Sequence, residues 1–432
     1  MPDWKKEIKL SDLVPKRKPK EPMDEVDEAP KEKKQRTSFL KKDLSFKRKP
    51  KAERAEAAED EQPRKEKRKR APREARPKRA KKVVGLKIGG SQLAAARVVN
   101  NGSPELVQVA RENLDHGLVV GGELREPERL AEELRAFFRK HKLPRQGVRL
   151  GIANNRIGVR IFEIAGIDDP KQLENAIRFR AQEVLPIPIE EAVLDYQVLG
   201  DRVDDEGNKV RRILLVVAYR ELIDRYVSAC KKAGIRLAGI DLEAFALLRA
   251  LATPREDESV PADAAVVVVA IGHDRSTFAV SDGRVCEFTR VLDWGGGTLD
   301  VAIARELAAA PSEAEPVKRD LSLAVENVPE GLTPEQAATA REAVRRQLQG
   351  FARELVSSLQ FYQNQPGSLG IGEIVITGGT AHLPGLAEEL QKLIGVRVTV
   401  GDPLGRVKLG KKLKETEQVG SLAVAIGLGI ED

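Results

Sequence analysis

One local pattern occurs twice in this chain and constrains the fold more than any other feature. A short apolar strand, a glycine turn and a second strand are predicted at 83–99 and again at 264–280, about 180 residues apart. That spacing is too long for a short-period repeat protein. Because helices are predicted around both copies, the sequence indicates a duplicated α/β domain whose sheets are covered by helices.

The other predicted elements alternate between helix and strand. Apolar residues at helical spacing predict helices, and β-branched runs predict strands. The helices are predicted at 126–142, 173–184, 220–233, 241–251, 334–363 and 386–393. Further strands are predicted at 148–153, 159–164, 193–199, 212–218 and 374–376. A Pro-, Asp- and Glu-rich stretch at 253–263 is typical of an exposed junction.

The charge is divided unevenly along the chain. Residues 1–82 carry 30 Lys and Arg against 17 Asp and Glu, a net charge of +13, whereas residues 83–432 carry 44 against 50, a net charge of −6. The first segment has too few large apolar residues to offset its ordering entropy, so we expect a disordered basic tail. Its basic runs would attract polyanions, and an anionic membrane surface is one candidate partner. Specific nucleic-acid binding is not expected, because no aromatic residues are interleaved to stack on bases.

The composition excludes several classes of protein. Two cysteines, Cys230 and Cys286, exclude a disulfide scaffold and a four-thiolate zinc site, and four histidines disfavour a His-rich metal site. No run approaches the ~20 apolar residues that a membrane span needs. Residues 1–6 lead directly into charge and lack the apolar segment of a signal peptide. We therefore expect a reducing, cytoplasmic compartment.

Three glycine-rich turns follow apolar strands, at Gly89-Gly90-Ser91, Gly272 and Gly378-Gly379-Thr380. Glycine lets the backbone approach a phosphate closely, and free N–H groups can hold an anion. Any one of these turns is equally explained by the needs of a hairpin. All three together, two of them in the duplicated pattern, favour a phosphate-binding role.

Several stretches resemble the PilM family, the actin-like proteins of type IV pilus assembly that are related to FtsA. The resemblance covers about 83–430 and is most specific where Ser357-Ser358-Leu359-Gln360-Phe361-Tyr362 leads into Thr377-Gly378-Gly379-Thr380. It is also carried by residues 84–99, 179–196, 241–247, 295–304 and 314–318. The resemblance implies an α/β, actin-like, two-lobed ATPase fold. Its lobes would span 83–252 and 264–432, with a small inserted subdomain at about 155–235.

The resemblance also implies a cleft for ATP between the lobes. The residues implied to face the nucleotide are Gly89, Gly90, Ser91 and Gln92 at the phosphates, Gly272 in the second loop, Gly296 and Gly297 in the adenosine-side segment, Glu315 and Lys318 at the ribose and base, and Gly378, Gly379 and Thr380 over the adenosine. Taken alone, Glu315 and Lys318 are better explained as two solvated charges on a helix, and only their position beside the triple glycine at 295–297 makes the nucleotide role as good an explanation.

Two departures from the family pattern weaken the expectation of catalysis. Each phosphate loop of the family usually has an aspartate before Ile-Gly, and the first of these carboxylates holds the water shell of Mg²⁺. Here Lys87 and Ala270 stand at those positions. Because phosphoryl transfer depends on positioning and on charge neutralisation by Mg²⁺, we expect no catalytic residue, a doubtful Mg²⁺ site and no efficient ATPase activity. Lys87 could pair with phosphate oxygens, allowing ATP to bind without hydrolysis, or turn outward.

Two functions follow from the resemblance. The first is a cytoplasmic scaffold of type IV pilus or related secretion assembly, held peripherally at the inner membrane by its partners. In the family, the groove beside the inserted subdomain captures the cytoplasmic N-terminal peptide of the membrane protein PilN. The alternative is an active actin-like ATPase of the FtsA/PilM type. Residues 420–432 lack the basic face of an FtsA-like membrane helix, which favours the scaffold.

Overall fold

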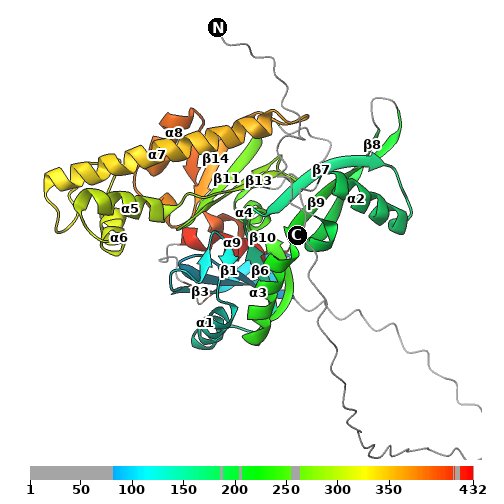
Figure 1. The fold of residues 1–432 in the computed structure, drawn as a ribbon, viewed down its shortest axis with the longest axis horizontal. Coiled ribbons are helices and arrows are strands. Elements are labelled where there is room, and N and C mark those ends of the chain that lie inside the picture. The colour runs from blue at the N-terminus through cyan, green and yellow to red at the C-terminus, as the bar shows by residue number, and fades with distance from the viewer. Residues whose placement is uncertain are drawn as a thin grey trace, which may run out of the picture. The chain divides into compact units, whose positions relative to one another are not determined.

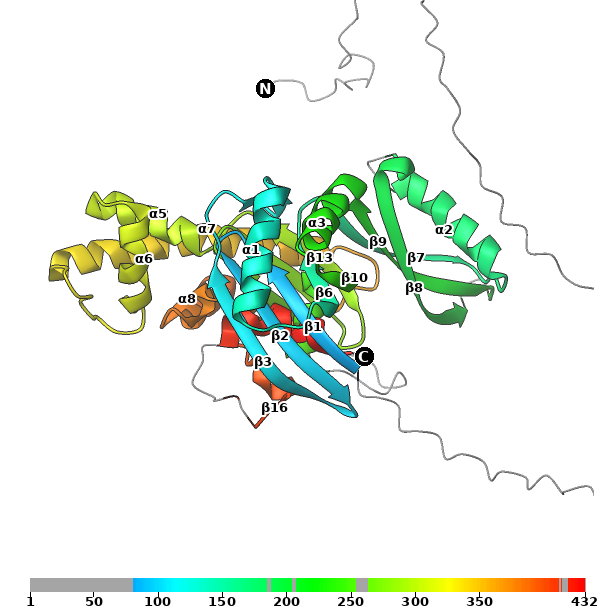
Figure 2. The same cartoon turned by 90° about the horizontal axis from the view of Figure 1, so that it is seen from below.

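The computed structural model describes residues 81–184, 188–203, 207–253, 263–411, 413 and 419–431. The predicted basic tail and the predicted junction at 253–263 lie outside these residues except at their edges, and both stay predictions. All described residues belong to one compact unit. Figures 1 and 2 show two large sheets, each with helices against it, and a smaller sheet beside them.

The first large sheet has six strands in the order β10-β6-β1-β2-β3-β16. β1, β2 and β3 are antiparallel neighbours, while β6 runs parallel to β1 and β10 runs parallel to β6. The bounds are β1 Lys81–Ile88, β2 Gln92–Asn101, β3 Ser103–Asn113, β6 Gln146–Ile152, β10 Arg236–Leu242 and β16 Lys408–Leu409. The predicted hairpin at 83–99 is confirmed as β1 and β2.

The second large sheet repeats this arrangement. Its order is β13-β12-β11-β14-β15, with an antiparallel hairpin, a third antiparallel strand on one side and parallel strands on the other. The bounds are β11 Ala265–Ile271, β12 Ser276–Ser281, β13 Cys286–Leu292, β14 Ile371–Thr377 and β15 Val398–Val400. The predicted duplicated α/β fold is therefore confirmed.

Helices cover both large sheets. In the first lobe, α1 (Pro127–Lys140) and α3 (Arg220–Lys232) pack on one face of the six-stranded sheet. In the second lobe, the outer face of the five-stranded sheet packs against the helices α5 Gly296–Leu307, α6 Pro311–Asp320, α7 Pro334–Gln363 and α8 Leu386–Ile394. The other face of β11 packs against apolar residues of α4 (Glu243–Leu251) and α9 (Ala423–Gly429), so every residue of this strand except Val266 is buried.

Two helices lie between the sheets. α4 and α9 pack together, and Ala246, Val268 and Val424 share one apolar cluster there. α9 also covers Ala96 and Val98 of β2. The backbones approach so closely that a Cβ atom at Gly427 would collide with the carbonyl oxygen of Ala246. The last described helix and β16 thus pack against the first sheet, although they lie within the range 264–432 expected for the second lobe.

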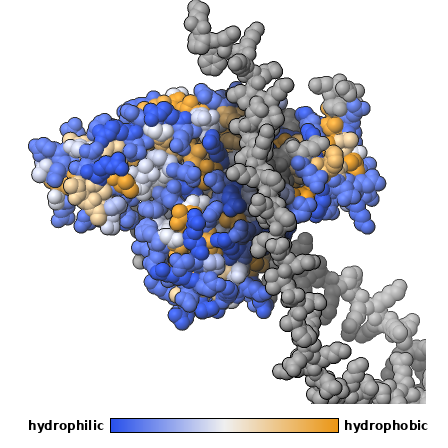
Figure 3. Space-filling model, in the orientation of Figure 1, coloured by the Kyte–Doolittle hydropathy of each residue, from blue (hydrophilic) through white to orange (hydrophobic). Residues whose placement is uncertain are grey.

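A separate three-stranded sheet, which we call the inserted sheet, has the order β7-β9-β8. β7 (Ile157–Ala165), β8 (Ala192–Val203) and β9 (Lys209–Tyr219) are antiparallel, and α2 (Pro170–Val184) packs on them through Leu173 and Ile177. The short helix η2 (Ile189–Glu191) leads into β8. Figure 3 shows apolar patches on this part of an otherwise mostly hydrophilic face.

The structure differs from the predicted elements mainly at boundaries. The helix predicted from Asp241 begins at Glu243, because residues 236–242 pair with β6 as β10. β3 was not among the predicted strands, since its polar composition carries little β signal. Among the described residues, no helix combines the length and apolar character needed to cross a bilayer.

Candidate functional site

The two hairpin turns of the duplicated pattern meet between the lobes. The first loop, Gly89–Ser91, joins β1 to β2, and the second loop, Gly272–Arg275, joins β11 to β12. Both begin with the same backbone hydrogen bond, from Gly89 N to Gln92 O (2.9 Å) and from Gly272 N to Arg275 O (3.0 Å). The carboxylate of Asp274 lies against Gly90, where a Cβ atom would be 2.9 Å from both carboxylate oxygens.

The second loop also contacts a turn of the first lobe. Strands β4 (Val119–Val120) and β5 (Glu123–Leu124) are joined by Gly121 and Gly122, both with positive φ. Gly121 N donates to Asp274 Oδ2 at 3.1 Å. The guanidinium of Arg275 fills the space beside Gly122 that a side chain would need. We call these contacts of Asp274 and Arg275 with Gly90, Gly121 and Gly122 the cross-lobe contact.

Buried polar groups hold the Gly121–Gly122 turn in place. Asn154 Nδ2 donates to Gly121 O at 2.8 Å, and the Tyr226 hydroxyl donates to Gly122 O at 3.1 Å. Burial raises the pKa of Tyr226, so the hydroxyl keeps its proton at neutral pH. Both carbonyls of the turn are thus bound within the first lobe, which fixes Gly121 N to donate to the second loop.

Two imidazoles also meet across the lobes. The ring centroids of His116 and His273 lie 5.2 Å apart. Burial, together with the nearby charges of His116 and Lys318, lowers the pKa of His273 below its ordinary value. The His273 ring is therefore favoured in its neutral form where the lobes touch.

Lys87 and Ala270 stand where the family usually has loop aspartates, and neither side chain is placed as a metal ligand would be. Lys87 Nζ lies 3.5 Å from Glu243 Oε2, and the Glu243 side chain is 3% exposed. Lys87 thus turns neither outward nor toward a phosphate but toward a buried carboxylate at the start of α4. Ala270 is buried in the apolar cluster that contains Ala246 and Val424.

The adenosine-side residues come together around the start of α5. Lys318 Nζ donates to Gly296 O (3.1 Å) and to Asp300 Oδ2 (2.8 Å). A Cβ atom at Gly296 would collide with Thr380 Oγ1. The side chain of Lys318 is therefore already held by α5 and its first turn.

Backbone N–H groups at the N-terminus of α5 donate hydrogen bonds to carbonyl oxygens of the second loop. Gly296 N donates to Gly272 O at 2.8 Å and Gly297 N donates to His273 O at 2.7 Å. A Cβ atom at Gly297 would lie 3.0 Å from the His273 ring. Two of the N–H groups that a helix start would offer to an anion are thus used within the protein.

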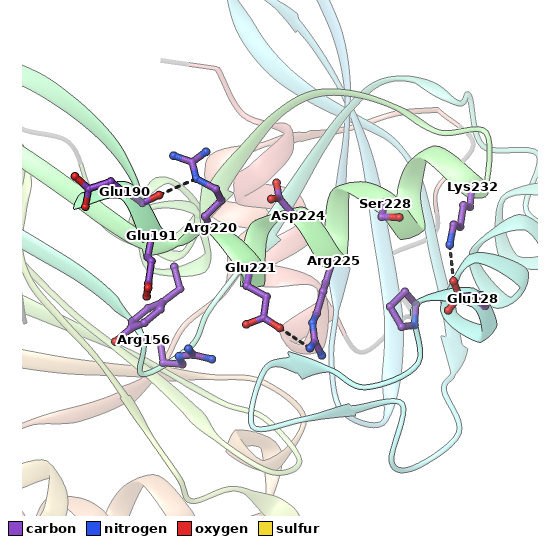
Figure 4. Close-up of a pocket in the computed structure, with 12 residues that line it drawn as sticks. Glu128, Arg156, Glu190, Glu191, Arg220, Glu221, Asp224, Arg225, Ser228 and Lys232 are labelled. Carbon is purple, nitrogen blue, oxygen red and sulfur yellow. Dashed lines mark hydrogen bonds and ion pairs between the residues drawn. The ribbon is translucent and has the colours of Figure 1, made fainter. Parts of the chain in front are cut away.

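A groove lies where the inserted sheet meets the first lobe (Figure 4). Its cavity of about 700 Å³ is bounded by α3, the start of α1 and η2. The lining residues are Pro127, Glu128, Arg156, Glu190, Glu191, Tyr219, Arg220, Glu221, Asp224, Arg225, Ser228 and Lys232. Of these, only Lys232 and Glu128 form an ion pair that links α3 to α1.

Basic side chains hold the walls of this groove. Arg220 donates to Glu190 O (3.3 Å) and Ala192 O (2.8 Å), and so ties η2 to α3. The guanidinium of Arg156 lies 4.0 Å above the ring of Tyr219. Arg225 pairs with Glu221 at 2.5 Å on the same helix. These contacts shape the groove from both sides.

Some groove carboxylates stay available to a ligand. Within the described ranges, neither Glu191 nor Asp224 has an ion-pair partner, and Asp224 is exposed on α3. The Glu190 side chain, next to Glu191, is likewise without an ion pair among these residues. The groove therefore offers negative charge beside the cation–π pair of Arg156 and Tyr219.

The comparisons with known proteins agree with this architecture. A family profile described as "Type IV pilus assembly protein PilM" matches residues 85–432. The chain belongs to the PilM family. A solved structure, the "PilM-PilN type IV pilus biogenesis complex", contains a chain that superposes with a TM-score of 0.67 at 26% identity, covering 80% of this chain and 97% of that one. The actin-like fold is thereby confirmed.

The PilM-family chain is also similar to cell division protein FtsA. The Escherichia coli K12 protein is 27% identical over 251 residues, which cover 53% of this chain and 58% of the relative. The Bacillus subtilis protein is 23% identical over 290 residues, covering 59% of this chain and 62% of the relative. The chain therefore spans less than two thirds of the length of these relatives.

The structure brings most of the predicted nucleotide residues of this PilM-family protein together. The loops at 89–92, 272 and 296–297 are linked through Asp274 and His273, while Lys318 and Thr380 contact Gly296. Gly378 has φ +98°, and a Cβ atom there would collide with Ile271 O; Gly379 is open. Their role toward a nucleotide stays a prediction.

Unlike Lys318 and Thr380, Glu315 makes its side-chain contact away from Gly296. Its carboxylate pairs with Arg319 at 2.6 Å one turn along α6 and is half-exposed. Burial acts to raise the pKa of Glu315, but the hydrogen bond from Arg319 and the charges of Arg319, Lys318 and His273 lower it overall. Glu315 therefore lies close to the cluster but points to a local partner.

The residues present do not fit a magnesium–triphosphate group. The departure positions carry a paired lysine and a buried alanine, and the carboxylate of Asp274 lies between the loops. In the part of the chain that the structure describes, no cluster of three or more His, Cys, Asp or Glu side chains is suited to a metal ion.

Sequence reasoning missed the residues that join the lobes. Asp274 and Arg275 follow the predicted second loop directly, and Gly121-Gly122 is a visible double glycine. Because Asp274 and Arg275 are charged and stand where the chain is expected to face phosphates, the sequence could have indicated that they form contacts there. The contact of His116 with His273 had no sequence signal, because the two residues lie far apart in the chain.

Proposed function

We propose that this protein is a component of type IV pilus or related secretion assembly that binds the cytoplasmic N-terminal peptide of a PilN-like inner-membrane protein. The groove beside the inserted sheet is the proposed site. The observation that carries the proposal is this groove of about 700 Å³ with its unpaired carboxylates Glu191 and Asp224. Family membership and similarity to a PilM–PilN complex support it.

The charge of the groove suits a peptide from that source. Cytoplasmic segments next to a membrane span carry an excess of Lys and Arg. Glu191 and Asp224 would attract such a segment, and the Arg156–Tyr219 pair would give its apolar residues a flat surface. Binding would hold the protein at the cytoplasmic face of the inner membrane. A basic tail would add attraction to anionic lipids.

The proposal includes a cleft that does not run an ATPase cycle. The ion pair of Lys87 with Glu243 and the apolar surroundings of Ala270 support this part. The alternative, an active ATPase of the FtsA/PilM type, would require metal-binding carboxylates at these positions, and neither position has one.

The test is a calorimetric titration of the full-length protein with a synthetic peptide. The peptide comprises the cytoplasmic N-terminal residues of the PilN-like protein encoded beside it. We expect saturable one-to-one binding that weakens at least tenfold in Asp224→Lys, because a groove carboxylate becomes a cation. Glu342→Lys, an exposed change on α7, is the matched control and should bind as the wild type does. Absence of binding, or an equal loss in both variants, would overturn the proposal.

A further inference from the structure

We infer that the Asp274 carboxylate lies beside the anion-binding turn of the first loop and keeps a phosphate out of it, so that a residue of the chain joins the lobes in the place of a phosphate. The inference goes beyond the peptide-binding role and depends only on contacts within the cleft. The cleft does not fit a magnesium–triphosphate group, and the inference gives Asp274 a structural role there.

The first loop is built to receive an anion. The N–H of Gly89 is used by Gln92 O, whereas the N–H groups of Gly90 and Ser91 donate to no acceptor within the described residues. Successive free N–H groups at a glycine turn form an anion-binding concavity. The carboxylate of Asp274 lies beside this turn, against the Cα atom of Gly90, where its Cγ and both oxygens would be 2.9 Å from a Cβ atom. Only glycine allows this approach. The N–H groups of Gly90 and Ser91 do not donate to it, so the concavity itself stays open.

The same carboxylate is bound by the first lobe. Asp274 Oδ2 accepts the hydrogen bond from Gly121 N at 3.1 Å. Gly121 is itself fixed by Asn154, which is 2% exposed. The carboxylate, carried on a loop of the second lobe, is therefore in contact with two separate turns of the first lobe.

Arg275 supplies the second half of the cross-lobe contact. Arg275 is 8% exposed, and its Nη1 atom is buried without a hydrogen-bond partner among the described residues. It lies against Gly122, directly beside the carboxylate-bearing residue Asp274. Among the described residues this guanidinium forms no ion pair with the Asp274 carboxylate, so it adds an uncommitted positive charge beside the concavity.

A carboxylate in this position disfavours a phosphate. A phosphate in the concavity would lie beside the Asp274 carboxylate, and the two negative charges would repel each other strongly in a partly buried site. We therefore expect the lobes of the wild-type protein to stay together without any nucleotide, and the concavity to accept inorganic phosphate once the Asp274 charge is removed.

The first experiment measures the distance between the lobes. Donor and acceptor dyes are attached to full-length protein at Glu132→Cys on α1 and Glu342→Cys on α7, both exposed. The natural thiols Cys230 and Cys286 are buried and stay unlabelled. We expect one high-transfer state in the wild type, unchanged by phosphate or ATP. Asp274→Ala should shift it to lower transfer, and phosphate should restore it. An unchanged distance in Asp274→Ala would overturn the inference.

The second experiment separates charge from shape. Asp274→Asn keeps an acceptor for Gly121 N and removes only the charge, so the variant should fold as the wild type does. We expect its affinity for inorganic phosphate, measured by calorimetry, to rise at least tenfold, and Glu342→Gln to leave affinity unchanged. Equal phosphate binding by wild type and Asp274→Asn would overturn the inference. The peptide titration reports on a different surface, so either proposal can fail alone.

Discussion

The ammonium nitrogen of Lys87 lies 3.5 Å from Oε2 of Glu243, joining the end of β1 to the start of α4. Glu243 is 2% exposed, and its Oε1 atom has no hydrogen-bond partner among the described residues. The carboxylate is therefore stabilised chiefly by one cation. Lys87, which stands where the family usually has a loop aspartate, thus forms an ion pair with Glu243.

Removing that cation should destabilise the protein. Lys87→Met leaves a buried carboxylate without compensation, and we expect the free energy of unfolding to fall by about 3 kcal/mol. Adding Glu243→Gln should recover part of the loss, because the charge is then gone as well. Urea unfolding followed by circular dichroism measures both changes. Equal midpoints for wild type and Lys87→Met would show that Glu243 is stabilised in another way.

Restoring the second loop carboxylate should not create a metal site. Ala270→Asp places a charge in the apolar cluster with Ala246 and Val424, so we expect a loss of about 3 kcal/mol in stability. Ala338→Asp, exposed on α7, should cost less than about 1 kcal/mol. Thermal unfolding of both variants, with and without Mg²⁺, distinguishes them. A Mg²⁺-dependent rise in the midpoint of Ala270→Asp would contradict this expectation.

Two adjacent glycines should respond differently to alanine. Gly378 has φ +98° and faces Ile271 O, whereas nothing lies within 4 Å of a Cβ atom at Gly379. We expect Gly378→Ala to lose about 2–4 kcal/mol of stability through backbone strain and collision. Gly379→Ala should change stability by less than about 1 kcal/mol. Urea unfolding of the two variants in parallel provides the measurement, and similar losses would refute it.

Acidification should weaken the protein through His273. Burial is the largest cause that lowers its pKa, followed by the charge of His116 and opposed by Asp300. The unfolded chain then binds the proton more readily than the folded one, so stability falls as the pH drops below the ordinary histidine pKa. We expect His273→Asn to lose less stability between pH 7.5 and 5.5 than the wild type. The same pH dependence in both proteins would assign the effect to other groups.

The sequence predicted the parts of the fold that depend on local pattern. The hairpin at 83–99, its copy at 264–280 and the helix at 334–363 all depend on periodicity and turn glycines, and all three are confirmed. By contrast, β16 has two residues, and its position beside Glu105 and Leu106 of β3 depends on a long-range contact. No local pattern encodes such a pairing.

In the candidate site, too, local features could be predicted from the sequence and long-range contacts could not. Glycine turns and the departures at Lys87 and Ala270 were visible in the sequence, but the partner of Lys87 was not. Glu243 looked like an ordinary first-turn residue of a helix, and only the tertiary structure brings its carboxylate to Lys87. Likewise, the cross-lobe contact unites Asp274 and Gly121, which are 153 positions apart.

The return of α9 to the first sheet affects how this protein can be synthesised. Ala96 and Val98 of β2 are covered by Ile426 and its neighbours, which follow β3 by roughly 300 residues. At about 5–20 residues per second, a ribosome takes roughly 15–60 s to add them. During that interval one apolar face of the first sheet has no native cover. The nascent chain therefore needs protection from aggregation until the ribosome has released α9.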